Sequence, residues 1–225
     1  MPLHIGIAAC SAEGAALCYR TICVEGAQLL GGHAHPEVSM HTPSLEDYMR
    51  RIYRGDWEGV GEMMLASARK LAGMGADFVI CPDNTLHQAL PHVAPRSPLP
   101  WLHIAEAVMA EARARGYQRI GLSGTRWLME GPVYPPALVR PDAPKIDFII
   151  TVCDTAAGED LSDWPGAPFI ARWRIEDEPQ APRSDATMRR AAASVEATAL
   201  KDMPSIGAQC FFSGSARIIG EFLKR

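Results

Sequence analysis

Short apolar runs alternate with segments of helical periodicity through this chain of 225 residues. Strands that are buried on both faces of a parallel sheet have this continuous apolar character, and the connections between them are usually helices. Right-handed crossovers are expected for such connections. The pattern predicts an α/β fold of parallel-sheet type with helices on both faces. The strands expected in one parallel sheet are His4–Ala9, Asp77–Cys81, Arg119–Leu122 and Asp147–Val152.

Helices are expected between and after these runs. Ser44 is a typical N-cap for the first of two consecutive helices, and the second begins at Trp57. Its apolar positions follow the spacing i, i+3, i+4, i+7 and i+11, and Gly73 and Gly75 end it. Further helices are expected over residues 104–115, 184–201 and 218–223.

Composition excludes several function classes. The net charge of −4 gives no indication of nucleic acid or an acidic membrane as a partner. No apolar run approaches the roughly 20 residues that span a bilayer, and the N-terminus lacks the basic region of a signal peptide. We therefore expect a cytoplasmic protein whose six cysteines are free thiols.

A polar cluster directly follows the apolar run that ends at Cys81. Pro82 stops the strand because it has no N–H for the sheet ladder, and the polar residues that come next are Asp83, Asn84, Thr85 and His87. Ligands of open α/β sheets bind at the carboxyl ends of the strands, so this cluster is a candidate site. An ordinary Asx-type turn that caps the next helix is the alternative.

Two other strand ends carry small polar residues. Ser11 follows the first strand, and a small carboxylate or phosphate site and a plain tight turn are both open there. Thr125 and Arg126 follow the strand that ends at Leu122. Hydroxyl, amide and guanidinium groups are all suited to a carboxylate. We expect Ser11, Asp83, Asn84, Thr85 and Thr125 to face one pocket, with Arg126 adding a charged contact.

We predict no metal site. His33, His35 and His41 lie around the expected second strand without a paired carboxylate motif. Cys10, Cys18 and Cys23 match no common zinc spacing and are interpreted as buried small apolar side chains.

Four segments in residues 3 to about 138 resemble the aspartate/glutamate racemase superfamily: IGIAACSAEGAALCYR, ADFVICPDNTLH, LPWLHIAEAV and IGLSGTRWLMEGPVY. The resemblance implies two Rossmann-like lobes with the site in the cleft between them. It also implies activity without a pyridoxal cofactor or any other. Ser11, Asn84, Thr85 and Thr125 would hold the substrate carboxylates.

Racemisation needs a general base on one face of the α-carbon and an acid on the other. The family normally uses two thiols, one of them directly before the Asn-Thr pair. Here Asp83 occupies that position and Cys81 lies two residues earlier, so both are candidate bases. The late Gly-Cys-Thr-Glu segment of the family is absent, and Cys210 is the only late cysteine.

Residues 141 to about 178 resemble the later part of thioredoxin-coupled arsenate reductases of the low-molecular-weight phosphatase type. The specific segments are IDFIITVCD and the WPG turn, but the Cys-x5-Arg phosphate loop is missing, and Cys153 is interpreted as an inert buried thiol. A proline cluster near residue 138 favours two domains, 1–138 and 139–225.

Three functions follow as alternatives. The first is a racemase or other isomerase acting on a small acidic amino acid or dicarboxylate by proton abstraction and return at the α-carbon. The second is a catalytically idle carboxylate-binding protein, and the third, weaker one is oxyanion chemistry of the arsenate reductase or phosphatase type. A small carboxylate is the expected partner in the first two, and a homodimer is left open.

Overall fold

The computed structural model describes residues 3–114, 116, 120–123, 125–134, 148–151 and 169–172. These fall into two compact units. The first contains residues 3–111 and Gly131–Tyr134, and the second contains 112–130 with two later strands. The domain boundary expected near residue 138 lies outside the described residues and stays a prediction.

A four-stranded parallel sheet forms the centre of the first unit, in the order β2-β1-β3-β4. The predicted α/β class is thereby confirmed, with β1 and β3 close to their expected bounds. Within this sheet Ile7 on β1 lies opposite Ile80 on β3. The strands are β1 (Ile5–Ala8), β2 (Val38–His41), β3 (Phe78–Ile80) and β4 (Trp101–Leu102).

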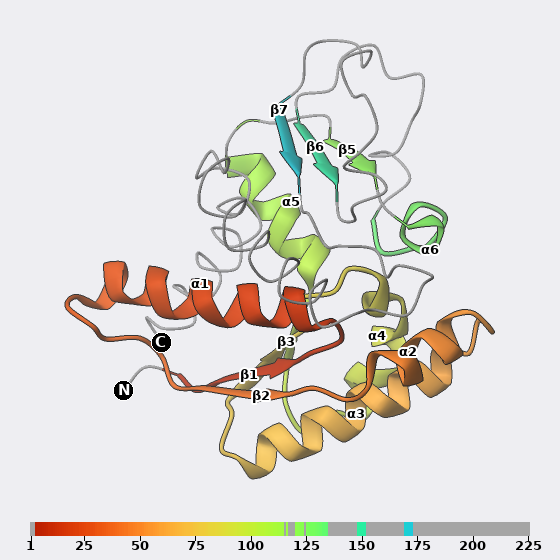
Figure 1. The fold of residues 1–225 in the computed structure, drawn as a ribbon, viewed down its shortest axis with the longest axis horizontal. Helices are drawn as coiled ribbons and strands as arrows, with labels where there is room; N and C mark the ends of the chain where they lie inside the picture. Colours follow the sequence, from red (N-terminus) through yellow and green to blue (C-terminus); the bar gives the residue numbers. More distant parts are fainter. Residues whose placement is uncertain are drawn as a thin grey trace, which may run out of the picture. The chain divides into compact units, whose positions relative to one another are not determined.

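Helices cover both faces of this sheet, as the apolar strands require. Figure 1 shows α1 on one face and α3 on the other. The longer helices are α1 (Ala12–Leu30), α2 (Leu45–Ile52), α3 (Trp57–Gly73) and α5 (Ile104–Ala114). Three short helical segments connect β3 to β4: η1 (Thr85–Ala89), α4 (Leu90–Val93) and η2 (Ala94–Arg96).

The core lies between α3 and the sheet. The expected apolar face of α3 is confirmed, since Val60, Met64 and Leu71 are fully buried. Ala8 on β1 and Val79 on β3 pack in one cluster with Leu71 and are also buried. Burying a side chain of this size stabilises the fold by about 1.5–3 kcal/mol.

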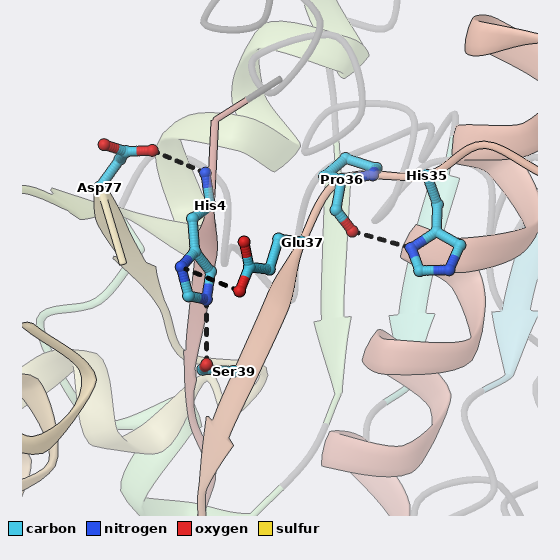
Figure 2. Close-up of polar contacts among 6 residues, drawn as sticks. All are labelled: His4, His35, Pro36, Glu37, Ser39 and Asp77. Atoms are coloured by element: carbon cyan, nitrogen blue, oxygen red, sulfur yellow. Dashed lines mark hydrogen bonds and ion pairs between the residues drawn. The ribbon is translucent and has the colours of Figure 1, made fainter. Parts of the chain in front are cut away.

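Polar contacts fasten the amino-terminal edge of the sheet, opposite to the strand ends with the polar clusters (Figure 2). The His4 N–H donates to Asp77 Oδ2 at 2.6 Å, and the Asp77 N–H donates to the His4 carbonyl at 2.8 Å. The His4 ring contacts Ser39 Oγ through Nε2 at 2.9 Å, with Glu37 3.8 Å from Nδ1. These contacts fix the register of β1 against both of its neighbours.

The second unit contains a three-stranded parallel sheet in the order β5-β6-β7. Its elements are β5 (Ile120–Ser123), β6 (Phe148–Thr151), β7 (Phe169–Arg172) and the short helix α6 (Arg126–Met129). Both expected strands here are present, but the four predicted strands belong to two sheets rather than one. Cys153, Cys210 and the helices expected over 184–201 and 218–223 lie outside the described residues.

Candidate functional site

The ends of β1 and β3 bring two polar segments together at the carboxyl edge of the first sheet. These strands are adjacent and parallel, with Ile7 opposite Ile80. Continuing that register past the strand ends places Cys10 beside Asp83. Both segments therefore leave the sheet at the same edge, where open α/β folds bind their ligands.

The Cys10 thiol and the Asp83 carboxyl group lie close enough to shift each other's pKa: Asp83 raises the pKa of Cys10, and Cys10 lowers that of Asp83. Asp83 Oδ1 also accepts the Leu86 N–H at 3.1 Å, and the Thr85 N–H donates to the same carboxyl group. The residue as a whole is partly exposed, but protein surrounds its carboxyl group, and this burial raises the pKa of Asp83. Burial, followed by the nearby Asp83 charge, raises the pKa of Cys10 as well, so this thiol stays protonated and acts as a donor.

Cys81 faces the same segment but contacts its main chain. The side chain is buried, and its thiol donates weakly to the Asp83 carbonyl, with 3.9 Å between sulfur and oxygen. Burial, followed by the Asp83 charge, raises the pKa of Cys81 well above the usual thiol range. Cys10 therefore lies at the carboxyl group of Asp83, and Cys81 contacts its main-chain carbonyl.

His87 holds the Asp83 loop in place through hydrogen bonds of both ring nitrogens. Its Nδ1 lies 2.8 Å from the Asp83 carbonyl oxygen, which only accepts, so Nδ1 carries the proton. Nε2 then accepts the Ile104 N–H at 3.1 Å. Burial, assisted by the neighbouring His103, lowers the pKa of His87 to about 3. His87 is thus a neutral bridge between the Asp83 loop and the start of α5.

Ser11 begins α1 as its N-cap. Its Oγ accepts the Gly14 N–H at 3.2 Å, which satisfies one free donor of the first helical turn. A Cβ on Gly14 would lie 3.0 Å from the Pro82 carbonyl oxygen and 2.9 Å from Ser11 Oγ. Because Gly14 has no Cβ, the start of α1 can lie directly beside the Asp83 loop.

Asn84 is oriented by a tyrosine from a distant part of the first unit. The Tyr134 hydroxyl donates to Asn84 Oδ1 at 2.7 Å, and Tyr134 is buried. Because the oxygen is engaged, the Nδ2 protons of Asn84 remain for another acceptor, and among the described residues they have none. Thr85 is partly exposed next to it.

Tyr48 contributes a further buried hydroxyl from α2. The residue has no solvent exposure, and its hydroxyl has no hydrogen-bond partner in the part of the chain that is described. Burial raises the pKa of Tyr48, and Cys81 and Cys10 raise it further, whereas the neighbouring Ser67 lowers it and Asp83 has a smaller raising effect. The sequence did not predict Tyr48 or Cys10 as site residues. The helical spacing around Tyr48 indicates only packing. Cys10, in contrast, lies directly before the N-cap of α1, and this position could have indicated a place at the site.

The predicted residues Thr125 and Arg126 belong to the second unit. They follow β5 at the carboxyl edge of the second sheet, and Arg126 begins α6. The Thr125 hydroxyl is buried without a partner among the described residues. Ser11, Asp83, Asn84 and Thr85 are brought to one sheet edge, while a pocket that also includes Thr125 stays a prediction.

The candidate metal ligands are separated by their contacts. His33 and His35 are exposed, and His35 Nδ1 donates to the Pro36 carbonyl at 2.8 Å (Figure 2). His41 instead lies between Ser67 and Lys70. Within the described residues no three His, Cys, Asp or Glu side chains are grouped as metal ligands, and no helix is long and apolar enough to cross a bilayer.

Comparison with known proteins identifies similar chains. The model of the Asp/Glu/Hydantoin racemase family matches residues 9–156. An Asp/Glu racemase candidate from Yersinia pestis has the same fold, with a TM-score of 0.63 and 18% identity over 88% of this chain and 99% of its own. An aspartate racemase homologue from Pyrococcus horikoshii OT3 aligns with a TM-score of 0.59 and 18% identity, over 76% of this chain and 92% of its own. The family match continues past residue 138 and includes β6, whereas the arsenate reductase resemblance of that segment stays a prediction.

Proposed function

Since this chain belongs to the Asp/Glu/Hydantoin racemase family, we propose that it is a cofactor-independent racemase or isomerase of a small acidic amino acid or related dicarboxylate. The observation that carries the proposal is the Asp83 carboxyl group. It stands where the family resemblance implies a catalytic thiol, and burial raises its pKa, which makes its carboxylate a stronger base than an exposed one.

Asp83 is a better candidate base than Cys81. A base must be ionised before it accepts the α-proton, and burial keeps the Cys81 thiol protonated. The Cys10 thiol and the main chain of Leu86 and Thr85 favour the ionised form of Asp83, while burial opposes it. On balance the pKa of Asp83 is raised, so its carboxylate is more basic than an exposed one.

The neighbouring polar groups are suited to a substrate carboxylate. Ser11 accepts a main-chain N–H through its oxygen, so its own proton is free to be donated, and Asn84 presents the two protons of Nδ2. Thr85 adds a third, hydroxyl donor at the same edge. Held in this way, a substrate would place its α-carbon next to Asp83. Thr125 and Arg126 are proposed to contact the substrate from the second unit.

In the proposed reaction the Asp83 carboxylate takes the α-proton and becomes a neutral carboxylic acid. The electron pair of the broken C–H bond moves into the substrate carboxylate, which becomes an enediolate stabilised by the surrounding donors. Return of a proton to the opposite face inverts the centre, and return from Asp83 restores the starting enantiomer.

Solvent deuterium exchange tests this proposal. Aspartate and glutamate of either hand are incubated with the protein in D2O, and loss of the α-proton signal is followed by NMR. Exchange that requires Asp83 is expected. Binding without exchange, lost on Thr85→Ala, would replace the proposal with the carboxylate-binding protein, and absence of both would end the proposal.

A further inference from the structure

The hydrogen bond between Tyr134 and Asn84 decides which end of an amide side chain is left for a ligand. The Tyr134 hydroxyl donates to Asn84 Oδ1 at 2.7 Å, and it has no second partner among the described residues. Tyr134 is buried, and this burial raises its pKa, so the hydroxyl keeps its proton. If the Asn84 amide turned over, Nδ2 would face the hydroxyl and the buried phenol proton would lose its acceptor, which is costly.

The main chain of Asn84 is held in place as well. Its carbonyl accepts the His87 N–H at 3.2 Å where η1 begins. On the residue before it, Asp83 Oδ1 accepts the Leu86 N–H at 3.1 Å. Asn84 is partly exposed, so a ligand can reach it. With Oδ1 and the carbonyl both engaged, the two protons of Nδ2 are the polar groups that its side chain offers.

The neighbouring side chains at this sheet edge also offer protons. Ser11 Oγ accepts the Gly14 N–H at 3.2 Å, which leaves its own O–H to be donated, and the Thr85 hydroxyl is partly exposed. A carboxylate has only acceptor oxygens and suits such a set of donors. The matching carboxamide replaces one oxygen with an NH2 group, and next to Nδ2 this would set N–H against N–H.

We propose that Tyr134 is a specificity-determining residue: by holding Oδ1 of Asn84 it makes the site accept a carboxylate and reject the corresponding amide. The proposal rests on the proposed function, in which the substrate is a small dicarboxylate. Tyr134 acts through Asn84 and needs no contact with the substrate. Without the phenol, Asn84 is free to turn over, and its Oδ1 can then accept the NH2 group of an amide.

The test measures the affinity of the full chain for aspartate and for its two mono-amides by calorimetry. Asparagine reports the side-chain carboxylate and isoasparagine, the α-amide, reports the α-carboxylate, so the amide that is rejected identifies the group held by Asn84. Tyr134→Phe is expected to reduce the preference for aspartate over that amide at least about tenfold, or about 1.4 kcal/mol. Tyr19→Phe, which removes an exposed hydroxyl on α1, is the control and should keep the preference.

A double variant tests whether Tyr134 acts through Asn84. In an Asn84→Ala background, Tyr134→Phe should leave both affinities unchanged, because residues that act through one contact are not additive. A further loss in this background would mean that Tyr134 acts by another route and would overturn the proposal.

Three other results would overturn it. Tyr134→Phe could weaken the binding of aspartate and of both amides equally, which would make the hydrogen bond only structural. The unchanged protein could bind aspartate and both amides equally well, or bind none of the three. A failure of the racemase proposal shows separately, as α-proton exchange that is absent or independent of Asp83 while the preference for the acid remains.

Discussion

The Cys10 thiol and the Asp83 carboxyl group influence each other's pKa across two adjacent parallel strands. Their separation in sequence is the offset of 73 that also relates His4 to Asp77 at the opposite edge. The contacts in Figure 2 therefore fix the register that brings the two site residues together. A slip of β1 against β3 would separate the thiol from the carboxyl group.

Asp83→Asn is expected to abolish α-proton exchange while the fold is retained. The amide has nearly the same shape and still accepts the Leu86 N–H through its oxygen, but it does not take up a proton near neutral pH. Removal of a general base costs about 10²–10⁴-fold in rate. NMR in D2O measures the exchange rate, and circular dichroism checks the fold.

Asp47→Asn is the matched control, since Asp47 is an exposed carboxylate on α2 that pairs with Arg50. Its exchange rate should equal that of the unchanged protein. Exchange that survives Asp83→Asn at more than a tenth of the original rate would show that another group is the base.

Cys10→Ala is expected to move the acidic limb of the exchange rate to higher pH. The Cys10 thiol lowers the pKa of Asp83, so its removal lets burial raise that pKa further. A thiol is a weak donor, and we expect a displacement of up to about one pH unit. The pH dependence of exchange measures it.

Cys10→Ser should return the limb toward its original position, because a hydroxyl donates to the same carboxylate. Cys18→Ala is the control: this thiol is also buried on the α1 side, but it does not act on Asp83. An identical pH profile for Cys10→Ala and the unchanged protein would contradict the role of Cys10.

The sequence predicted the strands and the part of the site that directly follows β3. The apolar run before Pro82 and the polar residues after it placed Asp83, Asn84 and Thr85 at a strand end, and the structure has them at the edge of the first sheet. Cys10 was expected to be buried, and it is. Its contact with Asp83 depends on the order and register of β1 and β3, which a list of strands does not contain.

Other parts of the site depend on tertiary placement alone. Tyr134 reaches Asn84 from a turn that has no periodic pattern, and Tyr48 occupies a helical position where any large apolar side chain would fit the spacing. The expectation of one sheet was wrong for a related reason. Alternation of strands and helices predicts parallel pairing, but it does not determine which strands are neighbours.

His87→Gln is expected to lower stability at pH 7 and to flatten its dependence on pH in acid. His87 has a folded pKa of about 3, below the usual value of about 6.5. The unfolded chain therefore binds the extra proton first, so this stability is present above about pH 6.5 and is lost as pH falls toward 3. The expected slope is at most about 1.4 kcal/mol per pH unit.

Urea unfolding from pH 7 to pH 4 measures this slope. Asp83 acts in the opposite sense, because its raised pKa makes the folded state the better proton acceptor, so the difference between variant and unchanged protein isolates His87. His92→Gln, an exposed position in the same segment, should keep the original slope. If stability depended on pH with the same slope in all three proteins, His87 would not be the neutral bridge between the Asp83 loop and α5.

Gly14→Ala is expected to disturb the site, whereas Gly73→Ala is expected to stabilise the protein. A Cβ on Gly14 would lie 2.9 Å from Ser11 Oγ and 3.0 Å from the Pro82 carbonyl oxygen. Backbone cannot yield as a flexible side chain does, so α1 must move away from the Asp83 loop. A Cβ on Gly73, the last residue of α3, meets nothing within 4 Å.

Each substitution changes a helical glycine to alanine, which by itself favours the helix by up to about 1 kcal/mol. Any difference between the two variants therefore reports the contact of Gly14 with Ser11 and Pro82. Exchange rate and affinity for a dicarboxylate should fall at least about tenfold for Gly14→Ala, as expected for a loss of about 1.4 kcal/mol, and stay unchanged for Gly73→Ala. If Gly14→Ala kept full exchange and affinity, the start of α1 would not be part of the site, and Ser11 would be only a helix cap.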